Sequence, residues 1–190
     1  MGENVLKEKQ LANKNIIVKK EADLGFSKCR LAFAKPKEIS DSDLNNKKIA
    51  TSYPAIVGNY LKKENITAEI IEIHGSVELT PFVGIADIVC DLVSTGITLE
   101  SNNLEESVTI LNSQALLIKS SEVDESKNML IKKLVSRIKS VIEASDSKYI
   151  MFNADTKDIE SLINLLPAAD SPTVIPLADK NKVAIHSVCK

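Results

Sequence analysis

The residues best suited to chemistry lie between Asp91 and Leu99, in the stretch DLVSTGITL. A buried strand is expected to end here in a turn around Gly96, because glycine adopts positive φ and leaves neighbouring N–H groups unshielded. Successive N–H groups in such a turn form a concave anion site, helped if a helix begins close behind it. The turn suits a phosphate monoester, and its hydroxyl donors would be Ser94, Thr95 and Thr98. A tight turn without a ligand is the alternative.

Acidic residues precede this turn and sharpen the interpretation. Asp91 ends the strand that leads into it, and Glu78 and Asp87 lie upstream. A carboxylate can accept hydrogen bonds from two vicinal hydroxyls, as in ribose recognition. A phosphate cradle beside such an acid therefore indicates a ribose 5-phosphate group. The structural alternative is that Asp91 binds N–H groups of the loop and that Asp87 caps a helix end, which we favour for Asp87.

Composition excludes several classes of protein. The chain has 190 residues, of which 44% are hydrophobic and 26% charged, so it can build a core and is not disordered as a whole. A net charge of −2, 4% aromatic residues and no Trp argue against a nucleic-acid surface. The apolar runs are too short to cross a membrane. Three widely spaced cysteines favour a reducing compartment, so we expect a cytoplasmic protein with no nucleic-acid or membrane partner.

Periodicity predicts an α/β lobe in the first two thirds of the chain. Residues 1–25 are polar and weakly patterned, like an edge piece, and a helix is expected to begin at Pro54. The alternation of strands and helices favours largely parallel strands. The expected order is strand 29–35, strand 47–53, helix 54–65, strand 66–75, a helix after Pro81, strand 88–93 and two strands within 108–119.

The last third predicts a long helix followed by a smaller unit. Residues 122–144 carry an apolar stripe at helical spacing. The order strand, helix, strand, strand is most of a ferredoxin-like unit, and that pattern calls for one more helix and strand. These four elements are expected at 148–155, 156–167, 171–178 and 182–189.

The stretch GSVELTPFVGIADIVCDLVSTGITL resembles the signature of the ATP phosphoribosyltransferases, which catalyse the first step of histidine biosynthesis. It carries the acid at Glu78, the pair Gly84 and Ala86, and the Asp91 that precedes the Thr95-Gly96-x-Thr98-Leu99 end. Five shorter segments on either side also match the family, and the two at 147–154 and 171–178 resemble its long form, which has its own regulatory domain. The flanking matches are GENVL at 2–6, LGFSKCRL at 24–31, KKIATSYP at 47–54, SKYIMFNA at 147–154 and SPTVIPLA at 171–178.

The resemblance implies transfer of a phosphoribosyl group from phosphoribosyl pyrophosphate to a ring nitrogen of ATP, with Mg²⁺ holding the pyrophosphate. The protein would act by positioning and electrostatic stabilisation, with no single catalytic residue. Histidine would be the feedback inhibitor, and the chain would form a homo-oligomer, a dimer or a hexamer. By resemblance, the 5-phosphate would be bound by Ser94, Thr95, Gly96 and Thr98, and the ribose by Glu78 and Asp91. ATP would be bound by Tyr53 and Ser27, and histidine by Asp155 and Thr173.

The implied fold is α/β: a periplasmic-binding-protein-like lobe with a mostly parallel sheet, plus a partial ferredoxin-like (ACT-like) C-terminal unit. Residues 1–25 would be a remnant of the first catalytic lobe, and 26–120 the second lobe with the phosphoribosyl pyrophosphate loop. Residues 121–147 would be a helix returning to the first lobe, and 148–190 an incomplete regulatory domain. The expectation is a chain truncated at both ends. The alternative function is a catalytically incomplete module that binds a phosphoribosyl group, another anion or histidine.

Overall fold

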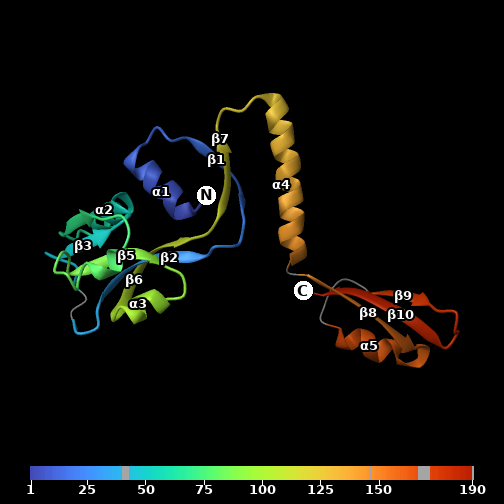
Figure 1. The fold of residues 1–190 in the computed structure, drawn as a ribbon. Coiled ribbons are helices and arrows are strands. Elements are labelled where there is room, and N and C mark those ends of the chain that lie inside the picture. The colour runs from blue at the N-terminus through green and yellow to red at the C-terminus, as the bar shows by residue number, and fades with distance from the viewer. Residues whose placement is uncertain (40–42, 146, 167–171, 190) are drawn as a thin grey trace. The chain divides into compact units, whose positions relative to one another are not determined.

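The computed structural model describes residues 1–39, 43–145, 147–166 and 172–189 (Figure 1). It forms two compact units, Met1–Asp124 and Glu125–Lys190. Within the described residues, no helix combines the length and apolar character needed to cross a membrane.

A five-stranded sheet in the order β4-β3-β5-β2-β6 forms the centre of the first unit. β3 runs parallel to β4 and β5, whereas β2 pairs antiparallel with β5 and with β6. Four of the five strands therefore run in one direction, as predicted, and β2 is inserted between two of them in the opposite direction. The strands are β2 (Cys29–Pro36), β3 (Lys48–Thr51), β4 (Glu69–Glu72), β5 (Ile88–Val93) and β6 (Leu104–Ser113).

Helical elements cover both faces of this sheet. α2 (Pro54–Lys63) packs Ile56, Val57 and Leu61 against one face. The other face is covered by η1 (Val77–Leu79) and α3 (Ile97–Ser101), through Val77 and Leu99. α2 and α3 lie on opposite sides of the sheet in Figure 1. The two layers bury the alternating apolar residues of β2 and β5 on both sides, which fixes the ends of these strands in space.

Residues 1–25, which have only weak patterning, form an ordered helix and strand. α1 (Glu3–Ala12) contacts α2, and β1 (Val18–Asp23) pairs antiparallel with β7 (Leu116–Ser120). The side chain of Glu8 accepts hydrogen bonds from the backbone N–H groups of Ala55 and Ile56, each over 2.8 Å. Helix α1 therefore supplies the carboxylate at the start of α2, because α2 has no acidic residue in its own first turn.

The prediction of a helix after Pro81 is wrong. The segment instead makes a turn in which Ile85 and Ala86 donate backbone hydrogen bonds to the carbonyl of Thr80, and Gly84 has φ 74°. The helical spacing of its apolar residues does not reflect burial, since Phe82, Val83 and Ile85 are all exposed.

Asp87 does not cap a helix end, which corrects the role favoured from the sequence. Its Oδ2 accepts a hydrogen bond from the backbone N–H of Lys48 over 2.7 Å, and its own N–H donates to the Lys48 carbonyl. Asp87 therefore ties the approach to β5 to the first residue of β3. Its role is structural, as we expected, but the partner is a strand.

The second unit follows the predicted elements closely. A three-stranded antiparallel sheet in the order β8-β10-β9 has the strand arrangement of a ferredoxin-like unit. One face of β10 is buried through Val183, Ile185 and Cys189. The predicted ends at Pro167 and Ser171 lie outside the described residues. The elements are α4 (Glu125–Ser145), β8 (Lys148–Asp155), η2 (Thr156–Asp158), α5 (Ile159–Leu165), β9 (Thr173–Pro176) and β10 (Lys182–Cys189).

Candidate functional site

The residues expected to bind ligands in the first unit gather at one end of its sheet. Parallel strands finish at the same end, so Tyr53 after β3, Glu78 after β4 and the loop 94–98 after β5 all lie there. β2 runs the other way and therefore starts at this end, with Cys29, two residues after Ser27. The carboxyl ends of parallel strands are where α/β sheets place their ligands.

The loop 94–98 offers its polar groups to solvent. The hydroxyl-bearing residues Ser94, Thr95 and Thr98 are exposed, and Gly96 has φ 86° as it leads into α3. Within the part of the chain that the structure describes, no group accepts a hydrogen bond from the backbone N–H of Thr95, Gly96 or Thr98. The loop therefore presents several unpaired donors, as an anion cradle requires.

Asp91 and Glu78 form the acidic part of the site. Asp91 is half-buried on β5, and its Oδ1 accepts a hydrogen bond from the backbone N–H of Leu92 over 2.8 Å. Burial raises the pKa of Asp91, and the negative charge of Glu78 adds to the rise, while the hydrogen bond from Leu92 opposes it. The two carboxylates are thus close enough to interact, and Asp91 keeps oxygen lone pairs for ligand hydroxyls.

Tyr53 is held by a residue that the sequence did not single out. Nδ2 of Asn4 donates to Oη of Tyr53 over 2.9 Å, and Asn4 itself is only 4% exposed. Asn4 is fixed in turn by Ser113, whose Oγ donates to Asn4 Oδ1 over 2.8 Å and accepts from the Asn4 N–H over 3.1 Å. Burial raises the pKa of Tyr53, the hydrogen bond from Asn4 opposes the rise, and the charge of Asp91 adds to it. The hydroxyl therefore keeps its proton as a hydrogen-bond donor. The only sequence signal for Asn4 was the GENVL match.

Ser27 precedes β2 at the same end of the sheet. It is exposed, and its φ of 51° is in the left-handed region that serine rarely adopts. The structure gives no direct contact between Ser27 and Tyr53. Lys28, which follows Ser27 in the chain, lines a pocket together with Ser113, the residue that holds the Tyr53 partner Asn4.

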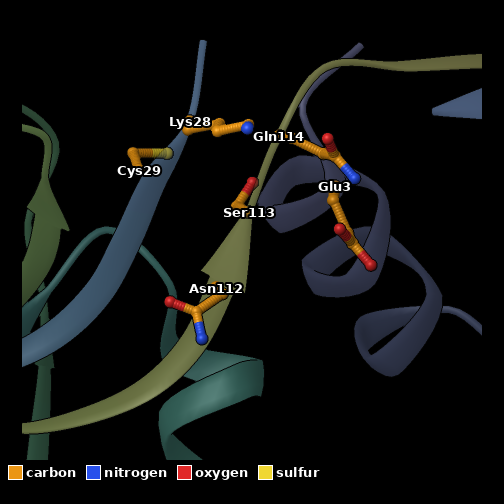
Figure 2. A pocket seen from close by; sticks show the side chains of 6 residues that line it. All are labelled: Glu3, Lys28, Cys29, Asn112, Ser113 and Gln114. Carbon is orange, nitrogen blue, oxygen red and sulfur yellow. The ribbon is translucent and has the colours of Figure 1, made fainter. Parts of the chain in front are cut away.

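This pocket has a volume of about 440 Å³ (Figure 2). Three segments build it: the start of β2, the end of β6 and the first turn of α1. The described lining is polar with one charge of each sign, and it does not include the loop 94–98. Sequence patterns could not reveal this pocket, because its residues are hydrophilic and far apart in the chain. The lining residues are Glu3, Lys28, Cys29, Asn112, Ser113 and Gln114.

In the second unit, the structure keeps the two expected effector residues apart. Asp155 lines a pocket of about 540 Å³ together with Thr156, Lys157 and Asn181. Thr173 is exposed on β9. Asp155 is opposite Lys182 of β10 and Thr173 is opposite His186, so both lie on one face of the sheet, with β10 between them. Four residues along β10 and two strand spacings across it separate the two positions by roughly 16 Å.

Among the described residues, no group of three or more His, Cys, Asp or Glu side chains has the arrangement of a metal site. Glu78 and Asp91 offer carboxylate oxygens at the same end of the sheet as the loop 94–98, and Asp91 lies on β5, the strand that leads into this loop.

Comparisons with known proteins match both units. The sequence pattern of the family "ATP phosphoribosyltransferase" matches residues 1–140, and that of "HisG, C-terminal domain" matches residues 144–190. Two curated relatives, both named ATP phosphoribosyltransferase, come from Azobacteroides pseudotrichonymphae and Bacteroides thetaiotaomicron. Each is 44% identical over 191 aligned residues, which cover 99% of this chain and 66% of the relative. The chain thus spans about two thirds of the length of these relatives.

A solved structure agrees with the sequence matches. It is the "ATP phosphoribosyl transferase (HisG:HisZ) complex from Thermotoga maritima", with a TM-score of 0.65 and 27% identity over 75% of this chain and 68% of that chain. The predicted fold class, an α/β lobe with a partial ferredoxin-like C-terminal unit, is confirmed. With matches along both of its units, this chain belongs to the ATP phosphoribosyltransferase family.

Proposed function

We propose that this chain acts in the ATP phosphoribosyltransferase reaction, in which phosphoribosyl pyrophosphate and ATP give phosphoribosyl-ATP and pyrophosphate, the first step of histidine biosynthesis. The observation that carries the proposal is the loop 94–98, whose exposed hydroxyls and unpaired N–H groups directly follow the strand that bears Asp91. Family membership supports the same reaction.

In this proposal, the loop holds the 5-phosphate of phosphoribosyl pyrophosphate. The backbone N–H groups of Thr95, Gly96 and Thr98 donate to phosphate oxygens, and the exposed hydroxyls of the loop add further donors. The carboxylates of Asp91 and Glu78 accept hydrogen bonds from the ribose hydroxyls. The raised pKa of Asp91 matters for this role, because only the ionised carboxylate offers every lone pair as an acceptor.

The ATP side of the site would be formed by Tyr53 and Ser27. The Oη of Tyr53 accepts from Asn4, and its proton has no acceptor among the described residues, so it is available to a nucleotide. The polar pocket beside Asn4 and Ser113 offers a further surface for that substrate.

The proposed chemistry is a displacement at the anomeric carbon of the ribose. The bond between this carbon and a pyrophosphate oxygen breaks, and the electron pair leaves with pyrophosphate. A ring nitrogen of the adenine supplies the electron pair of the new bond. Positive charge develops on the ribose in the transition state, and the carboxylates of Asp91 and Glu78 stabilise it electrostatically. The remaining residues orient the two substrates.

A divalent metal fits this arrangement, and we expect Mg²⁺. Carboxylate oxygens such as those of Glu78 and Asp91 are ligands of the kind that Mg²⁺ takes, and it commonly binds through substrate phosphates and water with few protein ligands. The metal would neutralise charge on the departing pyrophosphate. The protein residues would hold the ribose and the 5-phosphate in place.

A second candidate function rests on the pocket at Asp155. Its lining includes both an acid, Asp155, and a base, Lys157, which could pair with the ammonium and carboxylate groups of an amino acid. Histidine is the effector we expect, with Thr173 as a further contact. We also expect a homo-oligomer, a dimer or a hexamer, that works in the cytoplasm. The division into 1–25, 26–120, 121–147 and 148–190 stays a prediction.

The test is calorimetry of the whole chain with phosphoribosyl pyrophosphate, ATP and histidine in turn, followed by an assay for phosphoribosyl-ATP with Mg²⁺. Thr95→Ala combined with Thr98→Ala should weaken binding of phosphoribosyl pyrophosphate by at least about tenfold. Thr67→Ala is the matched control, because Thr67 is an exposed threonine just before β4, at the far end of the sheet. Binding without turnover would favour the binding-module alternative. A wild-type chain that does not bind phosphoribosyl pyrophosphate would overturn the proposal.

A further inference from the structure

Arg30 links the loop 94–98 to two strands of the sheet. It lies near the start of β2, opposite Val93 of β5 and Asn112 of β6. Its Nη1 donates to the carbonyl oxygen of Ser94 over 3.2 Å. The contact joins residues 64 positions apart in the chain, and Ser94 is the first residue of the loop 94–98.

A carboxylate on β6 fixes the orientation of this guanidinium. Nε and Nη2 of Arg30 donate to Oε1 and Oε2 of Glu106, each over 2.6 Å. Oγ1 of Thr109 also donates to Glu106 Oε1, over 3.1 Å. A bidentate pair of planar groups has a defined direction as well as strength. The Nη1 group of Arg30 is therefore aimed at Ser94 by a rigid support.

The contact to the Ser94 carbonyl sets the direction of the next amide. The C=O and N–H of a trans peptide group point in opposite directions, and the described residues contain no cis peptide bond. When Arg30 holds the Ser94 oxygen, the N–H of Thr95 must point away from Arg30. The Thr95 N–H is one of the unpaired donors of the loop.

We propose that Arg30, oriented by Glu106, is a positioning residue that turns the Thr95 amide toward the phosphate of the ligand. The proposal rests on the proposed function, because it assigns a role within the same site. Arg30 acts through geometry, since its charge is already paired with Glu106 and three of its N–H donors are engaged. The usual role of arginine, direct pairing with phosphate, is not required.

The test measures binding of phosphoribosyl pyrophosphate with Mg²⁺ to the whole chain by calorimetry. Arg30→Met keeps much of the hydrocarbon stem and removes all of the donors, so binding should weaken by about tenfold or more. Arg30→Lys should restore only part of this loss, because an ammonium group cannot hold both Glu106 oxygens and the Ser94 carbonyl in one plane. Lys20→Met is the control, because it removes an exposed ion pair to Asp23 on β1 and should leave binding unchanged.

Two further readouts separate positioning from a general loss of structure. ATP binding should stay within about twofold of wild type in Arg30→Met, because Tyr53 makes no bond to Arg30. The NMR shift of the Thr95 amide on adding phosphoribosyl pyrophosphate should shrink in Arg30→Met and persist in Lys20→Met. If Arg30→Met does not unfold in a cooperative thermal transition, Arg30→Lys and Glu106→Gln take its place in the test. Both variants should still weaken binding of phosphoribosyl pyrophosphate.

The possible failures are distinguishable. A wild-type chain that does not bind phosphoribosyl pyrophosphate would overturn the proposed function itself. A wild-type chain that binds, together with variants at Arg30 and Glu106 that bind equally well, would overturn only the positioning role. An equal loss of ATP and phosphoribosyl pyrophosphate binding would also overturn it, because it would show a general structural effect.

Discussion

Asn4 of α1 donates a hydrogen bond to the hydroxyl oxygen of Tyr53, 49 residues away in the chain, over 2.9 Å. The direction of this bond matters, because an oxygen that accepts from Asn4 keeps its own proton for another partner. Ser113 holds Asn4 through two hydrogen bonds, so the position of the tyrosine oxygen is fixed from α1 and β6 together. The N-terminal helix is thus part of the candidate site.

The first prediction follows from this bond. Tyr53→Phe removes the free hydroxyl donor and should weaken ATP binding by about tenfold, the value of one good hydrogen bond. Calorimetry of the whole chain measures this change. Binding of phosphoribosyl pyrophosphate should change much less, because the loop 94–98 is untouched. Tyr60→Phe is the matched control, since Tyr60 packs on Phe33 within the core and lies in the middle of α2. Equal ATP binding by Tyr53→Phe and wild type would remove Tyr53 from the nucleotide site.

The second prediction concerns stability. Glu8→Ala removes the carboxylate that accepts from the N–H groups of Ala55 and Ile56, and α2 has no side-chain cap of its own. The loss should be about 1 kcal/mol of unfolding free energy, as for other helix N-terminal caps, or about 4 °C in Tm. Thermal unfolding measures this effect. Glu122→Ala, at an exposed acid between β7 and α4, should change Tm by less than about 1 °C. A Glu8→Ala chain that melts with wild type would show that the cap contributes nothing.

The third prediction concerns pH. Burial raises the pKa of Asp91, so this carboxyl group takes up a proton at a higher pH than an ordinary aspartate. Protonation removes an acceptor for ribose hydroxyls, and affinity for phosphoribosyl pyrophosphate should therefore fall as the pH is lowered through that raised pKa. Asp91→Asn should bind weakly at every pH and lack this step. The phosphates of the ligand titrate in the same way in both experiments. Subtracting the pH dependence of Asp91→Asn from that of wild type therefore leaves the contribution of Asp91.

The raised pKa of Asp91 affects the stability of the fold in the opposite direction from ligand binding. A raised pKa means that the native state binds more protons than the unfolded state, so the contribution of Asp91 to stability falls as the pH rises above the unfolded value. Asp91→Asn should therefore raise Tm at pH 7, with a smaller gain at acidic pH. Glu78→Gln should lower the pKa of Asp91 in a carbon-13 NMR titration, by less than burial raises it. A Tm that falls at pH 7 in Asp91→Asn would contradict this reasoning.

Local patterns predicted much of the fold. The bounds of β5, β8 and β10 agree with apolar or alternating runs in the sequence, and α2 begins at Pro54 as expected. The placement of Tyr53, Glu78 and the loop at one end of the sheet follows from the parallel strands that precede them. In these segments, periodicity reports directly which residues are buried.

Contacts between distant segments could not be predicted in this way. Asn4 with Tyr53, Glu8 with Ala55 and Arg30 with Ser94 join residues 47 to 64 positions apart through polar side chains. No period of 2 or 3.6 residues marks such pairs. The incorrect prediction of a helix after Pro81 has a related cause. The apolar residues of this segment have helical spacing, but they lie on the surface around Gly84.

The last prediction tests the shape of the loop itself. Gly96 has φ 86°, and a Cβ added there would meet no atom within 4 Å, so Gly96→Ala is strained only through its backbone. Gly25 has φ 74° and equally open surroundings, which makes Gly25→Ala a matched control. Each change should cost about 1–2 kcal/mol of unfolding free energy, because L residues avoid the left-handed region.

Only one of the two glycine variants should affect ligand binding. Relief of the backbone strain in Gly96→Ala would turn the neighbouring amides and misalign the donors of the loop, so this variant should have about tenfold lower affinity for phosphoribosyl pyrophosphate. Gly25→Ala should melt at a similarly reduced temperature and bind like wild type. Because the two variants share the same backbone penalty, a difference in affinity between them isolates the geometry of the loop from the stability of the fold. Equal affinities would mean that the loop keeps its shape without glycine, and the anion cradle would then depend on its hydroxyl groups alone.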